Sequence, residues 1–128
     1  MTMGLDDAER RFREPRGIAR LWAGLLLAPA AWALQMAATY AVIPALCRAN
    51  ASGALLVVIS GLGLLVALGG LAFAFLNWRD AGKGWRATGK AAVDRARFMA
   101  VTGGLLAAYV TVIIAVQLAL SAGLDHCA

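Results

Sequence analysis

Charged residues are scarce in this sequence of 128 residues. Lys, Arg, Asp and Glu together make up 15% of it, whereas hydrophobic residues reach 62%. A soluble domain has about 25% charged residues. No charged residue lies between Leu21 and Cys47, between Ala49 and Trp78, or between Phe98 and Leu124. This absence argues against a proton-coupled carrier, because such a protein needs an ionisable group at membrane depth.

Histidine is equally rare, since His126 is the only one. A haem held between membrane helices needs two axial histidines, and a catalytic triad needs a histidine beside its nucleophile. The glycines lie inside apolar runs and not in a phosphate-binding loop after a strand. We therefore predict that the chain is not an enzyme and binds no cofactor by itself.

Three long apolar segments account for the hydrophobic content. Gly53–Leu76 has neither charge nor proline, and a helix of its roughly 24 residues would cross a hydrocarbon core about 30 Å thick. We predict membrane-spanning helices over residues 19–43, 53–77 and 98–122. The expected fold class is all-α, an integral membrane bundle of three transmembrane helices in a single domain, residues 1–128.

Two prolines interrupt the first span. Pro29 removes a backbone hydrogen bond inside the span and is expected to kink it, and Pro44 is expected to end it. The residues that follow Pro44, up to Ser52, then form a short link to the second span.

The remaining segments are polar. In the N-terminal segment, residues 1–18, Ala8 and Phe12 would share one face of an amphipathic helix on the membrane surface. The alternative, a solvated and frayed tail, is the simpler expectation, because so short a helix is marginal alone and Pro15 and Gly17 should break it. Residues 78–97 form the longest loop, with a helical pattern from residue 88 onward, and 123–128 form the tail.

Positive charge is confined to two of these segments. Eleven of the twelve Lys and Arg residues lie in the N-terminal segment through Arg20 or in the 78–97 loop, and only Arg48 lies elsewhere. Three spans place both segments on one side, which the positive-inside rule assigns to the cytoplasm. Arginine greatly outnumbers lysine, as in proteins from GC-rich bacteria. We predict a multi-pass protein of a bacterial inner membrane, with the N-terminus in the cytoplasm and the C-terminus outside.

The net charge of +5 is interpreted as attraction to anionic lipid headgroups and not to nucleic acid. Tryptophans at the cytoplasmic ends of the first two spans match an aromatic belt. The residues predicted to contact lipid headgroups or an acidic partner surface are Arg10, Arg11, Arg13, Arg16, Arg20, Arg79, Lys83, Arg86, Trp22 and Trp78.

The only two cysteines, Cys47 and Cys127, fall on the side predicted to lie outside, where disulfides persist. Three possibilities stay open: a disulfide, a copper or zinc site that includes His126 and Asp125, and free thiols. We predict the disulfide and no metal, because adjacent residues such as His126 and Cys127 rarely ligate one ion.

Few polar side chains lie within the spans. Gln35 and Gln117 are expected to hydrogen-bond to each other or to a backbone carbonyl, and Thr39 lies near Gln35 along the first span. The alternative is a hydrogen bond from these glutamines to a quinone oxygen or to the edge of a haem in a partner.

Small residues recur at helical spacing and would let helix backbones approach closely. Because three helices cannot bury all of their Leu, Val, Ile and Phe side chains, lipid or a partner must cover the rest. The predicted packing rows are Gly63, Ala67, Gly70 and Ala74 on the second span, Gly104, Ala108, Thr111, Ala115, Ala119 and Ala122 on the third, and Ala30, Ala33 and Ala37 on the first.

Scattered positions in the first and third spans form a pattern. They are Trp22, Gly24, Ala28, Pro29, Trp32, Gln35, Tyr40, Pro44 and Cys47, and then Arg97, Phe98, Gly103, Gln117 and Cys127. The pattern resembles a loose group of small bacterial three-span proteins whose genes accompany haem–copper cytochrome oxidase clusters. In that group the position of Gln35 is often histidine, so its absence here argues against a ligand role.

The resemblance implies an accessory or assembly subunit of a respiratory complex. Our first functional hypothesis is therefore a non-catalytic subunit of a larger bacterial membrane complex of the cytochrome oxidase type. One alternative is a homo-oligomeric transporter or channel lined by Gln35, Thr39 and Gln117. A second is a metal-delivery factor that uses Cys47, His126 and Cys127 on the outer face.

Overall fold

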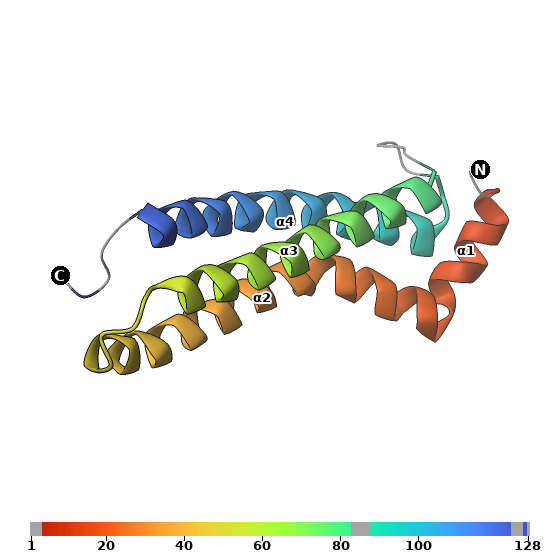
Figure 1. The fold of residues 1–128 in the computed structure, drawn as a ribbon. Coiled ribbons are helices and arrows are strands. Elements are labelled where there is room, and N and C mark those ends of the chain that lie inside the picture. The colour runs from red at the N-terminus through yellow and green to blue at the C-terminus, as the bar shows by residue number, and fades with distance from the viewer. Residues whose placement is uncertain (1–3, 83–87, 124–126, 128) are drawn as a thin grey trace.

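The computed structural model describes residues 4–82, 88–123 and 127, and most of these form α-helices. A short helix α1 (Leu5–Arg13) precedes three long ones, α2 (Pro15–Arg48), α3 (Ala54–Asp80) and α4 (Ala91–Gly123) (Figure 1). Helices α2, α3 and α4 are each long and apolar enough to cross a membrane. The all-α prediction, with three long apolar helices compatible with a membrane bundle, is confirmed.

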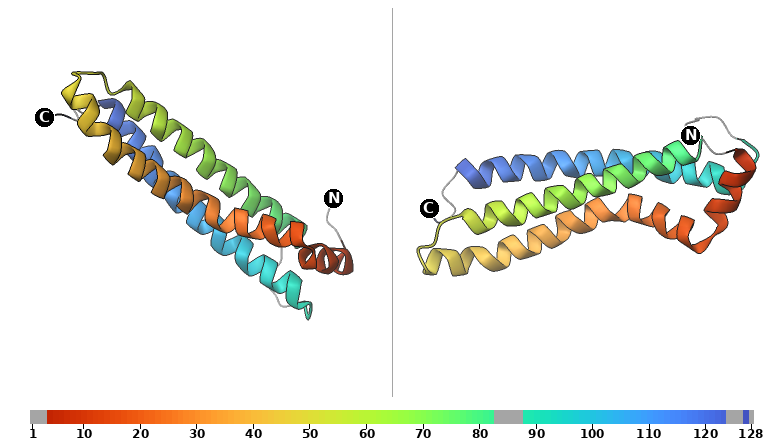
Figure 2. Two further views of the ribbon diagram at one scale, coloured as in Figure 1. Left: turned by 90° about the horizontal axis from the view of Figure 1, so that it is seen from below. Right: turned by 45° about the vertical axis from the view of Figure 1, so that its right-hand side comes forward.

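The three long helices run side by side, and each contacts the other two (Figures 1 and 2). One end of this bundle, which we call the basic end, holds α1, the first turns of α2 and α4, and the last turn of α3. The opposite end, where α2 leads into α3, we call the disulfide end. Helix α1 packs at the basic end against α2 and α4.

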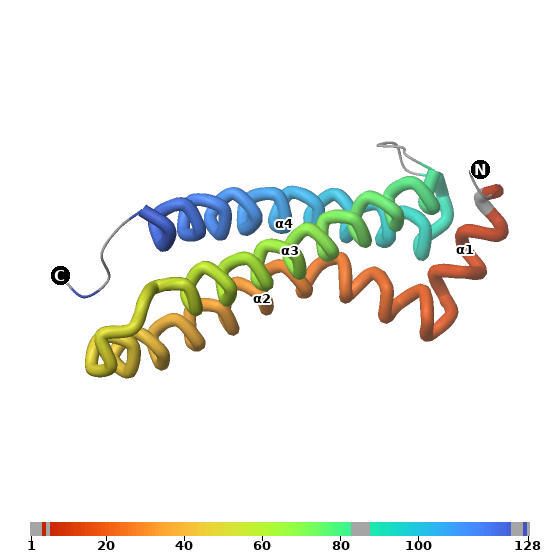
Figure 3. The backbone as a smooth tube through the Cα atoms, in the orientation of Figure 1, coloured from red at the N-terminus to blue at the C-terminus, as the bar shows by residue number. Residues whose placement is uncertain are grey.

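The prolines of α2 differ in part from the prediction. Pro15 separates α1 from α2 and is also the first residue of α2, because its fixed φ suits the first helical position and Glu14 provides an extended N-cap. Gly17 lies inside α2. Pro44 does not end the helix, which continues to Arg48. Figure 3 shows α2 bent in its orange middle part, the region that contains Pro29, as expected.

The frayed-tail interpretation of the N-terminal segment is wrong. Ala8 and Phe12 are fully buried, and Phe12 is among the largest buried side chains of the chain. Their apolar face does not rest on a membrane surface but on the bundle itself, which supplies the stability that a nine-residue helix lacks alone. The other buried members of this cluster are Leu21, Ala81, Ala92, Val93 and Ala96.

Polar contacts also tie α1 to the start of α4. Lys90 Nζ lies 2.8 Å from Asp6 Oδ1, and the backbone N–H of Val93 donates to Glu9 Oε2 at 3.2 Å. The hydrogen bond and charge of Lys90 lower the pKa of the Asp6 carboxyl, and Asp6 in turn raises the pKa of Lys90.

The sign of these shifts predicts a pH window for α1 docking. Asp6 stabilises the contact above its ordinary pKa and loses this effect as the pH falls through its lowered pKa. Lys90 stabilises it below its ordinary pKa and loses this effect as the pH rises through its raised pKa. The protection factors of α1 amides, which correct hydrogen exchange for its intrinsic pH dependence, should therefore be highest between these limits and lower in Asp6→Asn. The same profile in Asp6→Asn and in the control Asp7→Asn would contradict this.

The small-residue row on the second span is placed as predicted. Gly63, Ala67, Gly70 and Ala74 are all buried on α3. Close approach is the reason, since a Cβ at Gly70 would lie 3.2 Å from the backbone nitrogen of Ala28.

The predicted rows on the other two spans do not lie at the helix contacts within the chain. On α4 Ala108, Ala115, Ala119 and Ala122 are exposed and Gly104 and Thr111 only half-buried, while on α2 Ala30, Ala33 and Ala37 are exposed. Doublets such as Gly103–Gly104 and Ala107–Ala108 supply a small residue to two adjacent rows, so spacing alone did not identify the inner one. The buried rows are Ala96, Ala100, Gly103, Ala107, Val110 and Ile114 on α4 and Gly17, Leu21, Gly24, Ala28, Ala31 and Gln35 on α2.

Candidate functional site

Asp80, which was predicted to lie in the 78–97 loop, joins three helices at the basic end. Because α3 extends to Asp80, this side chain is buried beside α1 and α2. Arg20 Nη1 donates to Asp80 Oδ2 at 3.1 Å, and Arg11 Nη2 lies 3.5 Å from the same oxygen. Asn77 Nδ2 donates to the backbone carbonyl of Arg20 at 3.0 Å. Arg11 and Arg20, assigned from sequence to lipid or a partner, thus form ion pairs within the chain.

Two more arginines of the basic end bond to helix termini. Arg97 Nε donates to the carbonyl of Ala81 at 2.7 Å, just after the last turn of α3, and Arg95 Nη2 donates to the carbonyl of Phe12 at 3.3 Å in α1. Cations stabilise carbonyls at helix C-termini, where no backbone donor remains. Part of the positive charge that was interpreted as attraction to anionic lipid headgroups therefore stabilises the fold of the chain.

The other residues predicted to contact headgroups differ in their exposure and in their contacts within the chain. Arg13 pairs with Glu9 in α1 at 2.9 Å. Trp78 is half-buried, with its ring 6.3 Å from that of Phe75, whereas Trp22 is half exposed. Lys83 and Arg86 lie outside the described residues. Arg10, Arg16 and Arg79 are exposed.

A polar layer crosses the interior of the bundle within its apolar part. Gln35 on α2 is only 4% exposed, and its Nε2 donates to Ser60 Oγ at 3.2 Å and to Gln117 Oε1 at 3.1 Å. The predicted bond between Gln35 and Gln117 is confirmed, and Ser60 of α3 completes the layer. Gln117 Nε2 lies 3.7 Å from the thioether sulfur of Met36, a weak acceptor. Thr39, one turn further along α2, is half-buried.

One atom of this layer is unsatisfied. Gln35 Oε1 is buried and has no hydrogen-bond donor among the described residues. An unpaired polar atom away from water costs about 1–3 kcal/mol. It lies beside Gly63, where an added Cβ would come within 3.1 Å of it. Both residues line an apolar groove of about 300 Å³ between α2 and α3, whose other walls are Leu27, Ala30, Ala31, Leu34, Ala38, Ile59, Leu62 and Val66.

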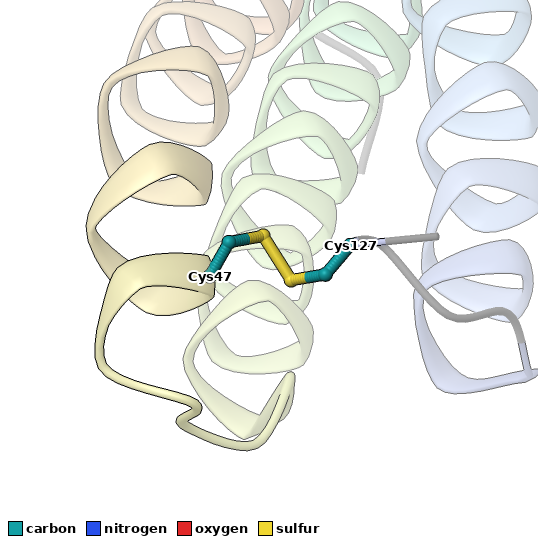
Figure 4. Close-up of a disulfide and its surroundings, with 2 residues drawn as sticks. All are labelled: Cys47 and Cys127. Carbon is teal, nitrogen blue, oxygen red and sulfur yellow. A yellow bond between two sulfur atoms is a disulfide. The ribbon is translucent and has the colours of Figure 1, made fainter.

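The disulfide end is closed covalently. Cys47 and Cys127 form a disulfide with a Cα–Cα distance of 5.6 Å, which confirms the predicted pairing (Figure 4). Cys47 lies in the last turn of α2 and not in the link. No group of three His, Cys, Asp or Glu side chains that would hold a metal occurs among the described residues, which do not include His126 or Asp125.

We expect this disulfide to stabilise the bundle. It spans 80 residues, for which the chain-entropy model gives roughly 4–5 kcal/mol in a free coil. Helices held in a bilayer have less freedom to lose, so Cys127→Ser should lower the free energy of unfolding by about 2 kcal/mol. Unfolding in mixed micelles with and without reductant measures this. Reductant should destabilise the wild type and leave Cys127→Ser unchanged, and an equal response of both would contradict the prediction.

Comparison with known proteins adds no assignment. No protein-family profile, no curated protein and no solved structure matches this chain.

Proposed function

We propose that the protein is a non-catalytic accessory or assembly subunit of a larger bacterial membrane complex of the respiratory, cytochrome oxidase type. One observation carries this proposal: the three long helices are joined to each other by contacts inside the chain, while their outer faces are apolar. Ion pairs join the helices at one end, a disulfide joins them at the other, and glutamines bond to each other between them. Large apolar side chains nevertheless remain exposed on every long helix, such as Leu34, Leu65 and Leu105. The respiratory assignment rests on the sequence resemblance.

We place the protein in the bacterial inner membrane with the basic end in the cytoplasm. This orientation is supported by charge, because among the described Lys and Arg residues only Arg48 lies at the disulfide end. A disulfide facing the oxidising side of that membrane agrees with it. The exposed Arg10, Arg16 and Arg79 would then meet anionic headgroups or acidic patches of the partner.

We place a helix of the partner on the small-residue row of α4, whose members are Gly104, Ala108, Thr111 and Ala115. Ala108 and Ala115 are exposed and Gly104 and Thr111 are half-buried, and small residues allow a second backbone to approach closely. The hydroxyl of Thr111 donates to the carbonyl of Ala107 at 2.6 Å, so it brings no unpaired donor to such a contact.

Extraction in mild detergent followed by native mass analysis tests the proposal. We expect the wild-type chain to travel with the subunits of a larger respiratory complex. Ala108→Leu should release it, because the added side chain holds the partner helix away. The control Ala33→Leu adds the same group to an exposed alanine of α2 and should leave the complex intact. A monomer or a self-oligomer from wild-type membranes would overturn the proposal.

Neither alternative function gains support from a particular contact. Gln35 and Gln117 bond to each other inside one chain, so they are poorly placed to line a pore between copies. In the disulfide, Cys47 and Cys127 offer no thiolates for metal delivery.

A further inference from the structure

None of the described residues donates a hydrogen bond to the buried Oε1 of Gln35. Both hydrogens of Gln35 Nε2 are engaged, one by Ser60 Oγ and the other by Gln117 Oε1. In this arrangement Oε1 is the atom without a partner, and a carbonyl oxygen only accepts hydrogen bonds.

The surroundings of this oxygen suit an apolar ligand. Gln35 and Gly63 both line the groove between α2 and α3, and Gly63 packs so closely on Gln35 that a Cβ added there would lie 3.1 Å from Oε1. All other residues that line the groove are apolar. Leu34 and Leu62 on its rim are 72% and 59% exposed, so the groove opens sideways, toward the lipid if the helices span a membrane. Its volume of about 300 Å³ is at the lower bound of ordinary small-molecule sites.

We propose that this groove binds a bilayer-soluble apolar molecule that ends in a hydroxyl group, with the hydroxyl donating to Gln35 Oε1. The ring hydroxyl of a quinol and the terminal hydroxyl of an aliphatic lipid alcohol share this chemistry. A quinone or an ether does not, because its oxygen would face the glutamine oxygen with no hydrogen between them. This inference concerns the single chain and holds whether or not the chain joins a larger complex.

The test compares two probes that differ only in the donor. 4-Nonylphenol carries a hydroxyl on an apolar body, and 4-nonylanisole carries a methyl ether in its place. Partition of each probe between nanodiscs that contain the full-length protein and empty nanodiscs gives binding beyond dissolution in lipid. We expect the phenol to bind the wild type about tenfold more tightly than the ether. Dodecanol, as a third probe, separates an aliphatic alcohol ligand from a phenolic one by whichever binds more tightly.

Three variants locate the site. Gln35→Met removes the acceptor and should abolish the preference for the phenol. Ala38→Leu fills the groove and should weaken the binding of both probes about tenfold. Because it does not alter the polar layer, it still tests the site if Gln35→Met fails to fold. Ala37→Leu adds the same side chain to the neighbouring exposed position outside the groove and should change nothing. Equal binding of phenol and ether by the wild type, no binding above empty nanodiscs, or equal effects of Ala38→Leu and Ala37→Leu would overturn the proposal.

Discussion

Replacing Gly103 with valine should lower the free energy of unfolding by about 3 kcal/mol or prevent the bundle from forming, because overpacking against backbone cannot be relieved by a side-chain rotation. A Cβ at this position would lie 2.7 Å from the carbonyl oxygen of Gly24 and 3.1 Å from the Cα of Leu25. Both atoms belong to the backbone of α2. The two helices must therefore move apart, and the buried contacts on either side of Gly103 would loosen with them.

The neighbouring glycine provides a matched control. The nearest atom to a Cβ at Gly104 is the Cβ of Ala74, at an ordinary contact distance of 3.8 Å. Gly104→Val should thus lower the free energy of unfolding by less than about 1 kcal/mol, because the added Cβ meets no backbone atom of another helix and the side chain can be accommodated. Titration with SDS in mixed micelles, followed by tryptophan fluorescence, measures both variants. Equal destabilisation by the two substitutions would show that α2 and α4 do not meet at Gly103.

Replacing Asp80 with alanine should lower the free energy of unfolding by about 2 kcal/mol, because it removes a buried, charge-assisted hydrogen bond. The main loss is the charge-assisted hydrogen bond from Arg20, whose side chain is 23% exposed. Arg11 is 42% exposed, so solvent screens its pair with Asp80 and it adds little. Removal of the carboxylate also leaves the two arginines close together without an anion. We expect the amides of α1 to exchange faster, since Arg11 links α1 to α3, but α1 should stay docked through Phe12.

Two variants help to interpret the loss of stability in Asp80→Ala: one separates the charge of Asp80 from its shape, and the other is a control. Asp80→Asn keeps the size and one acceptor oxygen and should recover part of the loss. Asp7→Ala removes an exposed carboxylate of α1 and should change stability by less than about 0.5 kcal/mol. The same SDS titration, with hydrogen exchange of α1 as the local measurement, compares them. Full stability of Asp80→Ala would mean that the buried carboxylate contributes nothing to the junction.

The contacts inside the bundle were more predictable from the sequence than those at its basic end. Inside the spans, the pairing of Gln35 with Gln117 was foreseeable because an apolar helix offers a buried amide few other partners. The pairing of Cys47 with Cys127 was equally constrained, since these are the only cysteines of the chain. In contrast, Ser60 was one of several hydroxyl residues in the spans, and nothing in its spacing marked it as the third member of the polar layer.

At the basic end, long-range contacts decided what local patterns left open. Helix α1 is too short to be stable alone, and it folds because Phe12 is buried against residues some eighty positions away in α4. Asp80 reads as a loop residue until α3 is seen to run past its apolar stretch to reach Arg20.

Hydrophobic length and the absence of charge were sufficient to determine three apolar helices, because a run of more than twenty such residues has few other stable states. The two cysteines and the two glutamines added their pairings. Only the tertiary structure decided which face of each helix turns inward, that α1 docks on the bundle, and that Gln35 keeps one oxygen unpaired beside a groove. Those outcomes depend on the distances between backbones, and a sequence in which small residues occur on several faces does not specify which faces meet.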